Sequence, residues 1–292
     1  MHFAQISDIH VPDFEGVRVR DFMNKRATGL LNLLTGRRGA HPIELAERLI
    51  EDLANQKLDH VMVTGDLTNL SLPGEFQRAS KLLRLLGGFD KLTVIPGNHD
   101  VYTKGAELSG RFQGYFADLL WPGDTPAEDR VFPVVKDLGP ISVFALSSAI
   151  ATAPLIAWGE VSKEQLKVLE RELAAPPRQG QFKVVLVHHN LHTVRSPWKQ
   201  YSSRLRNADA VTEVCTRQGV DLILHGHTHG AHRFTAERDG RTVTVIGCGS
   251  STQMSQDPLK VARYNIYSVS KKQLKVRTRV YDLVERRFGW LV

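Results

Sequence analysis

Short apolar segments that end abruptly in metal-binding residue types are the feature that most constrains the fold of this chain. They recur along the sequence with helical segments between them, which is the pattern of an α/β layered fold rather than of a β-sandwich or a helical bundle. The predicted core strands are residues 3–6, 60–64, 92–95, 141–146, 182–187 and 221–224. The predicted helices are residues 42–56, 75–86, 163–173 and 208–218.

The last third of the chain changes character. Four further strands are predicted there, at residues 233–237, 242–246, 264–269 and 274–281. Asp239-Gly240 and Lys271-Lys272 stand where turns would join these strands. Because no internal repeat, low-complexity tract or linker interrupts the sequence, we expect a single domain over residues 1–292.

The composition of the 292 residues, 42% hydrophobic and 24% charged, is that of a globular protein with a deep core. Cys215 and Cys248 lie far apart, so neither a disulfide framework nor a cysteine zinc site is indicated. The first residues lack the features of a secretory signal, and no apolar run approaches the roughly 18 to 20 residues that span a bilayer. We expect a cytoplasmic protein that could lie peripherally on the inner membrane.

Side chains suited to metal binding follow five of the predicted strands. They are Asp8 and His10, then Asp66, then Asn98, His99 and Asp100, then His188 and His189, and finally His227 and His229. Ligands in α/β sheets bind beyond the carboxyl ends of the strands, so these clusters should converge there. Glycines beside Asp66, Asn98 and His227 would let the backbone approach an ion closely.

Two metal ions roughly 3.5 to 4 Å apart provide what phosphodiester hydrolysis needs, which is a hydroxide equivalent and positive charge near the phosphate oxygens. Such a pair requires a bridging carboxylate, and Asp66 fits that role because it stands alone after its strand. Nitrogen and oxygen ligands without thiolate suit Mn, Fe, Zn, Co or Ni and argue against a copper or iron–sulfur site.

The ordered motifs Asp-x-His, Gly-Asp, Gly-Asn-His-Asp, a histidine after an apolar strand and Gly-His-x-His span Asp8 to His229 and resemble the calcineurin-like metallophosphoesterase superfamily. The resemblance implies an α/β fold, a four-layer α/β/β/α sandwich of two mixed sheets flanked by helices. It also implies two divalent or mixed-valence ions, the first held by Asp8, His10, Asp66 and His229, and the second by Asp66, Asn98, His188 and His227. A metal-bridging hydroxide would attack phosphorus, and His99, oriented by Asp100, would act as general acid or stabilise the transition state.

The remaining histidines match no such motif. His2, His41, His60 and His232 are interpreted as ordinary surface or boundary residues. His189 could contact substrate, or it could pack behind His188. His225 is expected to support the Gly-His-Thr-His turn rather than to bind metal.

The modest length and the His188-His189 pair resemble bacterial class III cyclic nucleotide phosphodiesterases, so a phosphodiester, with a cyclic nucleotide as one candidate, is the first substrate hypothesis. Asn190 stands where those enzymes typically have proline. The expected partner is a small anionic phosphate compound.

An insert at residues 11–41 suggests an alternative substrate. It contains an amphipathic helix whose apolar face would carry Met23, Ala27, Leu30 and Leu34, flanked by Arg18, Arg20, Arg26, Arg37 and Arg38. The helix could pack on the body. Otherwise it would form a lid or interfacial element, as in UDP-diacylglucosamine pyrophosphohydrolases of the same superfamily.

Two other basic and aromatic segments have open roles. Residues 195–206, with Trp198 and Tyr201, could contact a phosphate, sugar or base. Residues 286–292 could be an interfacial element like the insert, a packed terminus or a dimer contact.

Rival functions fit the sequence less well. The net charge of +7 and the pI near 9.5 favour anionic partners and suggest a nuclease, but no DNA-binding or coiled-coil segment is appended, so nucleic acid is disfavoured. A non-catalytic scaffold is disfavoured because every motif ligand and His99 are present. A eukaryotic-type protein phosphatase would carry arginine-containing companions to the Gly-Asn-His-Asp motif.

Overall fold

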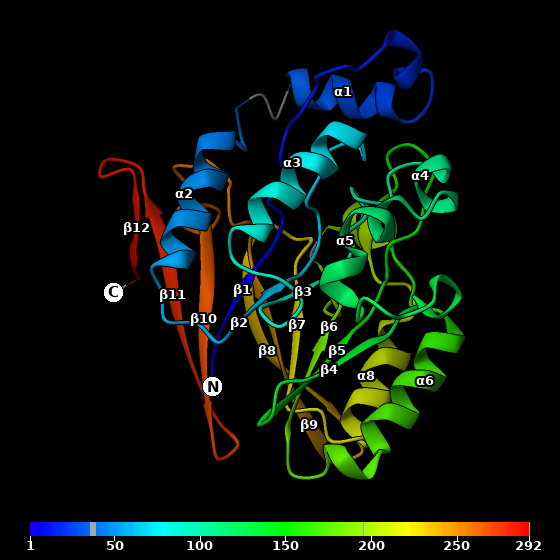
Figure 1. The fold of residues 1–292 in the computed structure, drawn as a ribbon, viewed down its shortest axis with the longest axis vertical. Helices are drawn as coiled ribbons and strands as arrows, with labels where there is room; N and C mark the ends of the chain where they lie inside the picture. The colour runs from blue at the N-terminus through cyan, green and yellow to red at the C-terminus, as the bar shows by residue number, and fades with distance from the viewer. Residues whose placement is uncertain (36–38, 195, 292) are drawn as a thin grey trace.

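Two six-stranded mixed sheets form the centre of the molecule (Figure 1). The computed structural model describes residues 1–35, 39–194 and 196–291, without the side chains at positions 32, 34, 35 and 177. The strand order is β12-β11-β10-β1-β2-β3 in the first sheet and β4-β5-β6-β7-β9-β8 in the second. The predicted α/β fold with two mixed sheets is therefore confirmed.

In the first sheet parallel strands form one half and antiparallel strands the other, whereas in the second sheet parallel strands lie at the middle and antiparallel strands at both edges. The first sheet is made of β1 (His2–Ile6), β2 (His60–Val63), β3 (Leu92–Val94), β10 (Arg263–Ser270), β11 (Gln273–Asp282) and β12 (Arg287–Trp290). The second is made of β4 (Val134–Asp137), β5 (Ile141–Ala145), β6 (Phe182–Leu186), β7 (Leu222–His225), β8 (Ala231–Arg238) and β9 (Arg241–Cys248). Because β1 to β3 are mutually parallel, as are β5 to β7, their carboxyl ends share an edge within each sheet.

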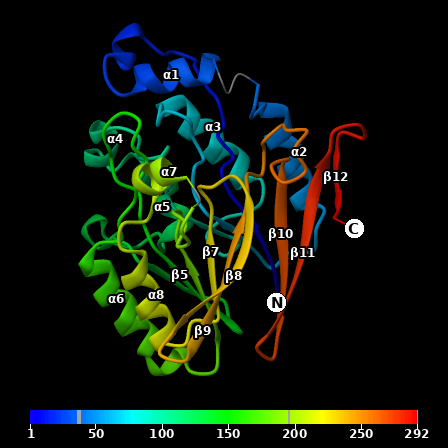
Figure 2. The same cartoon turned by 180° about the vertical axis from the view of Figure 1, so that it is seen from behind.

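Helices cover the outer face of each sheet, which completes the four-layer α/β/β/α arrangement predicted from the resemblance (Figure 1). The first sheet is covered by α2 (Ile43–Ala54), α3 (Pro73–Arg84) and α5 (Arg111–Leu120), and the second by α6 (Lys163–Ala174) and α8 (Ala208–Arg217). Shorter helices, α4 (Lys104–Leu108) and α7 (Pro197–Ser203), lie near the end of the molecule where α1 (Arg26–Thr35) sits (Figure 2). Single 3-10 turns occur at Val19–Phe22, Ala127–Asp129 and Pro176–Arg178.

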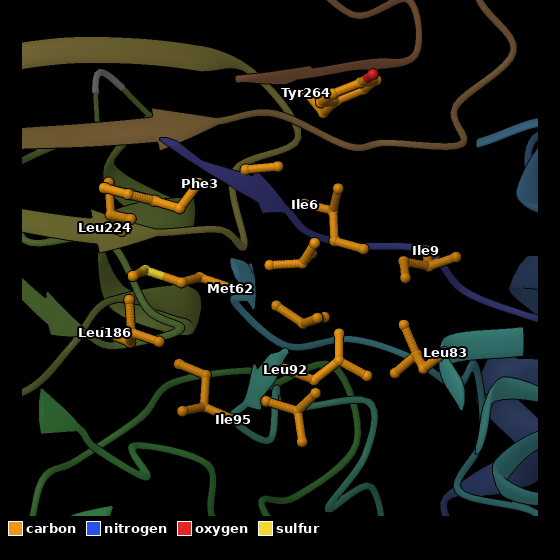
Figure 3. Close-up of a cluster of buried hydrophobic side chains, with 14 of the residues drawn as sticks. Phe3, Ile6, Ile9, Met62, Leu83, Leu92, Ile95, Leu186, Leu224 and Tyr264 are labelled. Atoms are coloured by element: carbon orange, nitrogen blue, oxygen red, sulfur yellow. The ribbon is translucent and has the colours of Figure 1, made fainter. Parts of the chain in front are cut away.

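The two sheets are joined by a layer of buried side chains (Figure 3). Met62 of the first sheet lies near Leu186 and Leu224 of the second, and all three are fully buried (Figure 3). One polar side chain, Gln5, crosses this layer. Its Nε2 donates to the backbone oxygen of His225 at 2.9 Å, and its Oε1 accepts from the Tyr267 hydroxyl at 2.6 Å. A buried amide with both ends satisfied fixes how the sheets align.

All ten predicted strands and all four predicted helices form, with ends that differ by a few residues. The turn residues Asp239, Lys271 and Lys272 adopt positive φ, as such turns require. The tail is a packed terminus, because β12 pairs with β11 and the guanidinium of Arg277 lies 3.7 Å from the Trp290 ring centre. Val292 lies outside the described residues, as does Arg195 of the other basic segment.

Among the residues that the structure describes, no helix combines the length and the apolar character needed to cross a bilayer.

The insert at residues 11–41 does pack on the body, but with a different face from the one predicted. Met23 precedes α1 and is 81% exposed, and Ala27 is exposed as well. The side chain of Leu34, and residues Arg37 and Arg38, lie outside the described part of the chain. The insert residues that pack on the small apolar cluster of Leu70, Leu72 and Tyr102 are Val17, Phe22, Leu30 and Leu33.

The buried side chain of Arg26 explains the rotated face of α1. Its guanidinium donates to the backbone oxygens of Leu70 at 2.7 Å and Ser71 at 3.0 Å, and only 8% of the residue is exposed. A buried arginine that donates to backbone carbonyls holds its own side of the helix against the body of the protein. The opposite side of α1 therefore presents Leu31 outward, at 61% exposure. Val19 and Met23, which precede the helix, are 85% and 81% exposed.

We predict that Arg26→Ala loosens α1 while leaving the sheets intact. The Leu70 carbonyl would lose its side-chain donor and the Ser71 carbonyl would keep only that of Arg111, which corresponds to about 1–3 kcal/mol of local opening free energy. Hydrogen exchange of the α1 amides measures this change, and Arg20→Ala, at an exposed position, is the matched control. Unchanged protection of α1 in Arg26→Ala would show that the arginine does not anchor the helix.

Candidate metal centre

The side chains predicted as metal ligands meet beyond the carboxyl ends of β1, β2, β3, β6 and β7. The ligand atoms of Asp8, His10, Asp66 and His229 lie within 4.8 Å of one another, and so do those of Asp66, His188 and His227. Asp66 belongs to both groups, as the bridging role requires. Each group contains residues expected to hold one ion. The remaining expected ligand, Asn98, lies beside the second group.

Asn98 completes the second group. Its Oδ1 lies 2.8 Å from Nδ1 of His227 and 3.2 Å from Nε2 of His188, while that same His188 nitrogen is 3.3 Å from Oδ2 of Asp66. In the first group, Nε2 of His10 lies 3.2 Å from Nε2 of His229 and 3.9 Å from Oδ2 of Asp66. Donor atoms of this kind, gathered this closely, suit cations that accept nitrogen and oxygen ligands.

Backbone hydrogen bonds from behind the centre fix which ring nitrogen faces it. Nδ1 of His10 lies 3.1 Å from the Thr68 carbonyl oxygen, and Nδ1 of His188 lies 2.7 Å from that of Thr64. A carbonyl can only accept, so Nδ1 carries the proton in both rings. Nε2 is thereby left with its lone pair directed at the centre, which is the arrangement of metal-binding histidines.

Five of the seven predicted ligands have a left-handed backbone. The φ angles are 51° for Asp8, 50° for His10, 56° for Asp66, 69° for His227 and 55° for His229. Non-glycine residues rarely adopt such angles, and each costs about 1–3 kcal/mol where the surroundings enforce it. The strained backbone at these strand ends therefore indicates that the direction of each side chain is fixed at the expense of backbone conformational energy.

The neighbouring glycines leave the space that these side chains occupy. A Cβ atom on Gly97 would lie 2.2 Å from Oδ1 of Asp66, and one on Gly226 would lie 2.7 Å from Oδ2 of Asp8. Gly65 combines a φ of +94° with a would-be Cβ position 2.6 Å from Nδ1 of His188. A side chain at any of these three glycines would therefore collide with a predicted ligand.

The two aspartates of the centre have opposite electrostatic surroundings. Burial acts to raise the pKa of Asp66, but the imidazoles of His188, His99 and His10 hold that pKa well below its usual range. Burial raises the pKa of Asp8 to about 7 against the pull of His188, and the charge of Asp66 adds to the rise. Two buried carboxylates at one point favour the binding of cations.

Asp100 was expected to orient His99, but in the structure Asn69 orients His99 and Asp100 binds backbone nitrogens. Nδ1 of His99 lies 2.6 Å from the carbonyl oxygen of Asn69, so Asn69 orients the ring. The Asp100 carboxylate accepts from the backbone nitrogens of Leu67, Thr68 and Gly97 at 2.9–3.2 Å. Asp100 therefore joins the segments after β2 and β3 and positions Asp66 and Asn98 through the backbone.

His41 is a site residue that the sequence analysis missed. It is buried, its ring centre lies 4.7 Å from that of His10, and its Nδ1 lies 2.9 Å from the Thr252 hydroxyl. The ligand atoms of His10, His41 and His229 lie within 4.8 Å of one another, so the three could hold an ion. The interpretation of His41 as an ordinary boundary residue is wrong. Only its position at the end of the insert beside the predicted centre could have suggested otherwise.

The other histidines outside the ligand set have different surroundings. His2 is exposed, as expected. His60 is buried, with its ring nitrogens 3.0 Å from the Asp90 carbonyl oxygen and 2.8 Å from the Thr93 hydroxyl. The ring of His189 packs 4.6 Å from that of His227, and its Nε2 lies 3.1 Å from the Ala157 carbonyl oxygen, which supports the packing alternative.

A cavity of about 260 Å³ opens beside Asn98 and His99. Its walls come from α1, from Tyr102 and from the loop between β5 and α6, and they include Leu33, Leu155 and Ile156. Lys25 ties α1 to this loop, because its Nζ donates to the Thr152 hydroxyl at 2.8 Å and to the Ile156 carbonyl at 3.0 Å. Burial lowers the pKa of Lys25 to about 8. The cavity thus joins the metal centre to a partly apolar wall.

The sequence matches the family model of the calcineurin-like phosphoesterases over residues 1–231, which is most of the chain and includes every strand end of the centre. The chain belongs to the calcineurin-like phosphoesterase family. A search of curated proteins gives no match.

Solved structures resemble the fold of this calcineurin-like phosphoesterase. Purple acid phosphatase PPD1 from yellow lupin seeds gives a TM-score of 0.62 at 15% identity, over 97% of this chain and 52% of the lupin enzyme. This chain thus spans about half the length of that enzyme. A dimetal phosphatase from Danio rerio gives a TM-score of 0.61 at 15% identity, over 96% of this chain and 94% of that one. At such low identity these likenesses support the fold alone.

We predict that Asp66→Ala removes both ions from this phosphoesterase, because both groups of ligands share that carboxylate. Elemental analysis after dialysis measures the metal content. Asp124→Ala, which removes an exposed aspartate, should keep the wild-type content. Retention of two ions by Asp66→Ala would refute the shared-ligand assignment.

Proposed function

We propose that this chain is a two-metal phosphohydrolase that cleaves a phosphodiester. The observation that carries the proposal is the position of Asp66, which is shared by two groups of ligands and lies beside a histidine ring that faces an open cavity. Asp8, His10, Asp66 and His229 would hold one ion, with His41 adjacent, and Asp66, Asn98, His188 and His227 would hold the other. When bound, the two ions supply positive charge for the phosphate oxygens and activate the attacking water.

His99 is the residue proposed to act on the leaving group. Since Nδ1 donates to the Asn69 carbonyl, Nε2 is the nitrogen that can take up and release a proton. The ring stacks on Tyr102, with centres 5.4 Å apart and planes at 18°, and it lines the cavity. Asn69 and Tyr102 therefore hold the ring in place, and protonated Nε2 would donate to the leaving oxygen.

We predict that His99→Ala keeps the metal content but lowers kcat by roughly 10² to 10⁴ for substrates with poor leaving groups. The loss should shrink for p-nitrophenyl esters, whose leaving group needs no proton. Steady-state rates for alkyl and p-nitrophenyl diesters compare the two cases. Equal losses for both would indicate that His99 binds phosphate instead of donating a proton.

A second candidate substrate class is a lipid-linked pyrophosphate, and the wall of the cavity favours it. Leu155 lines the cavity and is 68% exposed, which is unusual for a leucine beside a polar centre. Its backbone has a φ of 65°, so the loop holds this apolar side chain outward at a conformational cost. Leu31, Met23 and Val19 extend exposed apolar surface along the insert. An acyl chain leaving the cavity could cover these groups.

Leu155→Ser tests this candidate. We predict a fall in kcat/KM of about tenfold for a pyrophosphate with a long acyl chain, since about 0.8 kcal/mol is lost per methylene no longer buried. Hydrolysis of bis-p-nitrophenyl phosphate should not change. Leu85→Ser removes an equally exposed leucine, 71% exposed, at the end of α3 and should alter neither rate. If Leu155→Ser leaves the lipid-linked substrate unaffected, the phosphodiester remains the proposed substrate.

A further inference from the structure

Three histidines outside the metal centre gather on the outer, helix-covered side of the second sheet. His225 of β7 and His232 of β8 are both register partners of Gly247 on the intervening strand β9. Side chains alternate along a strand, so His225 shares a face with Ile223, and His232 shares one with Phe234. Both of those residues pack in the apolar cluster beneath α6 and α8. The imidazoles of His225 and His232 therefore lie on the same face of the sheet as this cluster and add polar groups at the end of its apolar part.

Gly247 provides the space between these two histidines. A Cβ atom there would lie 2.5 Å from Cε1 and 2.8 Å from Nε2 of His225, distances that no side chain could tolerate without displacing the ring. The φ of Gly247 is not positive, so no turn requires glycine at this position. The missing side chain lets the ring of His225 lean over β9 toward His232, with ring centres 6.4 Å apart.

His192, from the loop after β6, closes the group. Its ring centre lies 4.5 Å from that of His232 and 5.6 Å from that of His225. A point roughly 3.3 Å from all three ring centres lies within this triangle, which is about the separation for an ion bound 2.1 Å from a ring nitrogen.

Two nitrogens of the group are buried without a hydrogen-bond partner, as judged over the described residues. They are Nδ1 of His192 and Nε2 of His225. His225 is fully buried, and its Nδ1 lies 3.0 Å from the Gly226 carbonyl oxygen, so Nδ1 carries the proton and Nε2 carries a lone pair. An unmet buried polar atom costs about 1–3 kcal/mol. A fully buried lone pair beside two other imidazoles therefore favours a bound cation.

We propose that His192, His225 and His232 form a binding site for one further transition-metal ion, separate from the strand-end centre. Three imidazoles without a carboxylate select Zn²⁺ or Ni²⁺ over Mg²⁺, Ca²⁺ or Mn²⁺. Among the described residues, the ligand sets already within 4.8 Å belong to the strand-end centre. The half-buried rings of His192 and His232 therefore turn toward His225 when the ion binds, and the site is weaker than the main centre.

Zn²⁺ binding by the full chain tests the proposal. Isothermal titration of metal-free protein should give three equivalents in the wild type and two in His192→Asn and in His232→Asn. Both changes are at half-buried positions and should leave folding and hydrolysis unchanged. His2→Asn, at an exposed histidine, is the control and should keep all three equivalents.

The Asp66→Ala background separates this proposal from the proposed function. There the triad should still bind one equivalent, and adding His232→Asn should abolish it. Only two equivalents in the wild type, or a third equivalent that survives both His192→Asn and His232→Asn, would overturn the proposal. Gly247→Ala provides an independent variant, since its methyl group would fill the space between the rings and should also remove the third equivalent.

Discussion

The rest of the structure has to accommodate two buried carboxylates, those of Asp8 and Asp66, which lie together among imidazoles. Neither residue is more than 1% exposed. Burying such charges is unfavourable unless cations or hydrogen bonds compensate. The imidazoles hold Asp66 ionised, whereas the pKa of Asp8 rises to about 7. A bound cation would therefore add to the stabilisation that the imidazoles already give these carboxylates.

Placing these carboxylates requires both sheets and a strained backbone. The strand ends of the two sheets meet because an apolar layer and Gln5 fix the alignment of the sheets. The Asp100 carboxylate joins the loops after β2 and β3 by accepting hydrogen bonds from backbone nitrogens. The backbone carbonyl of Asn69 orients the His99 ring. The strain of positive φ at the ligands is balanced by this surrounding order. Chemistry at the centre thus depends on residues that never touch substrate.

The sequence predicts the core strands well, because period and composition reveal their apolar runs. The structure brings the seven predicted ligands together, since each of them follows one of these runs. It predicts less where tertiary contacts decide. No motif in the sequence around His41 indicates that it lies beside the metal centre, because it reaches that position at the end of the insert. The face of α1 was misassigned because a hydrophobicity pattern counts Arg26 as polar, whereas its guanidinium is satisfied by carbonyls in a buried position. Likewise α5 is not predicted from the sequence, since Gly114 within it weakens the helical signal.

Whether Asp66 joins two ions can be seen by anomalous diffraction from crystals soaked in Mn²⁺, because this measurement locates each ion relative to that carboxylate. We expect two peaks about 3.5–4 Å apart, one beside Asp8, His10 and His229 and the other beside Asn98, His188 and His227, with Asp66 between them. A single peak, or two peaks too far apart for one carboxylate to bridge, would contradict this expectation.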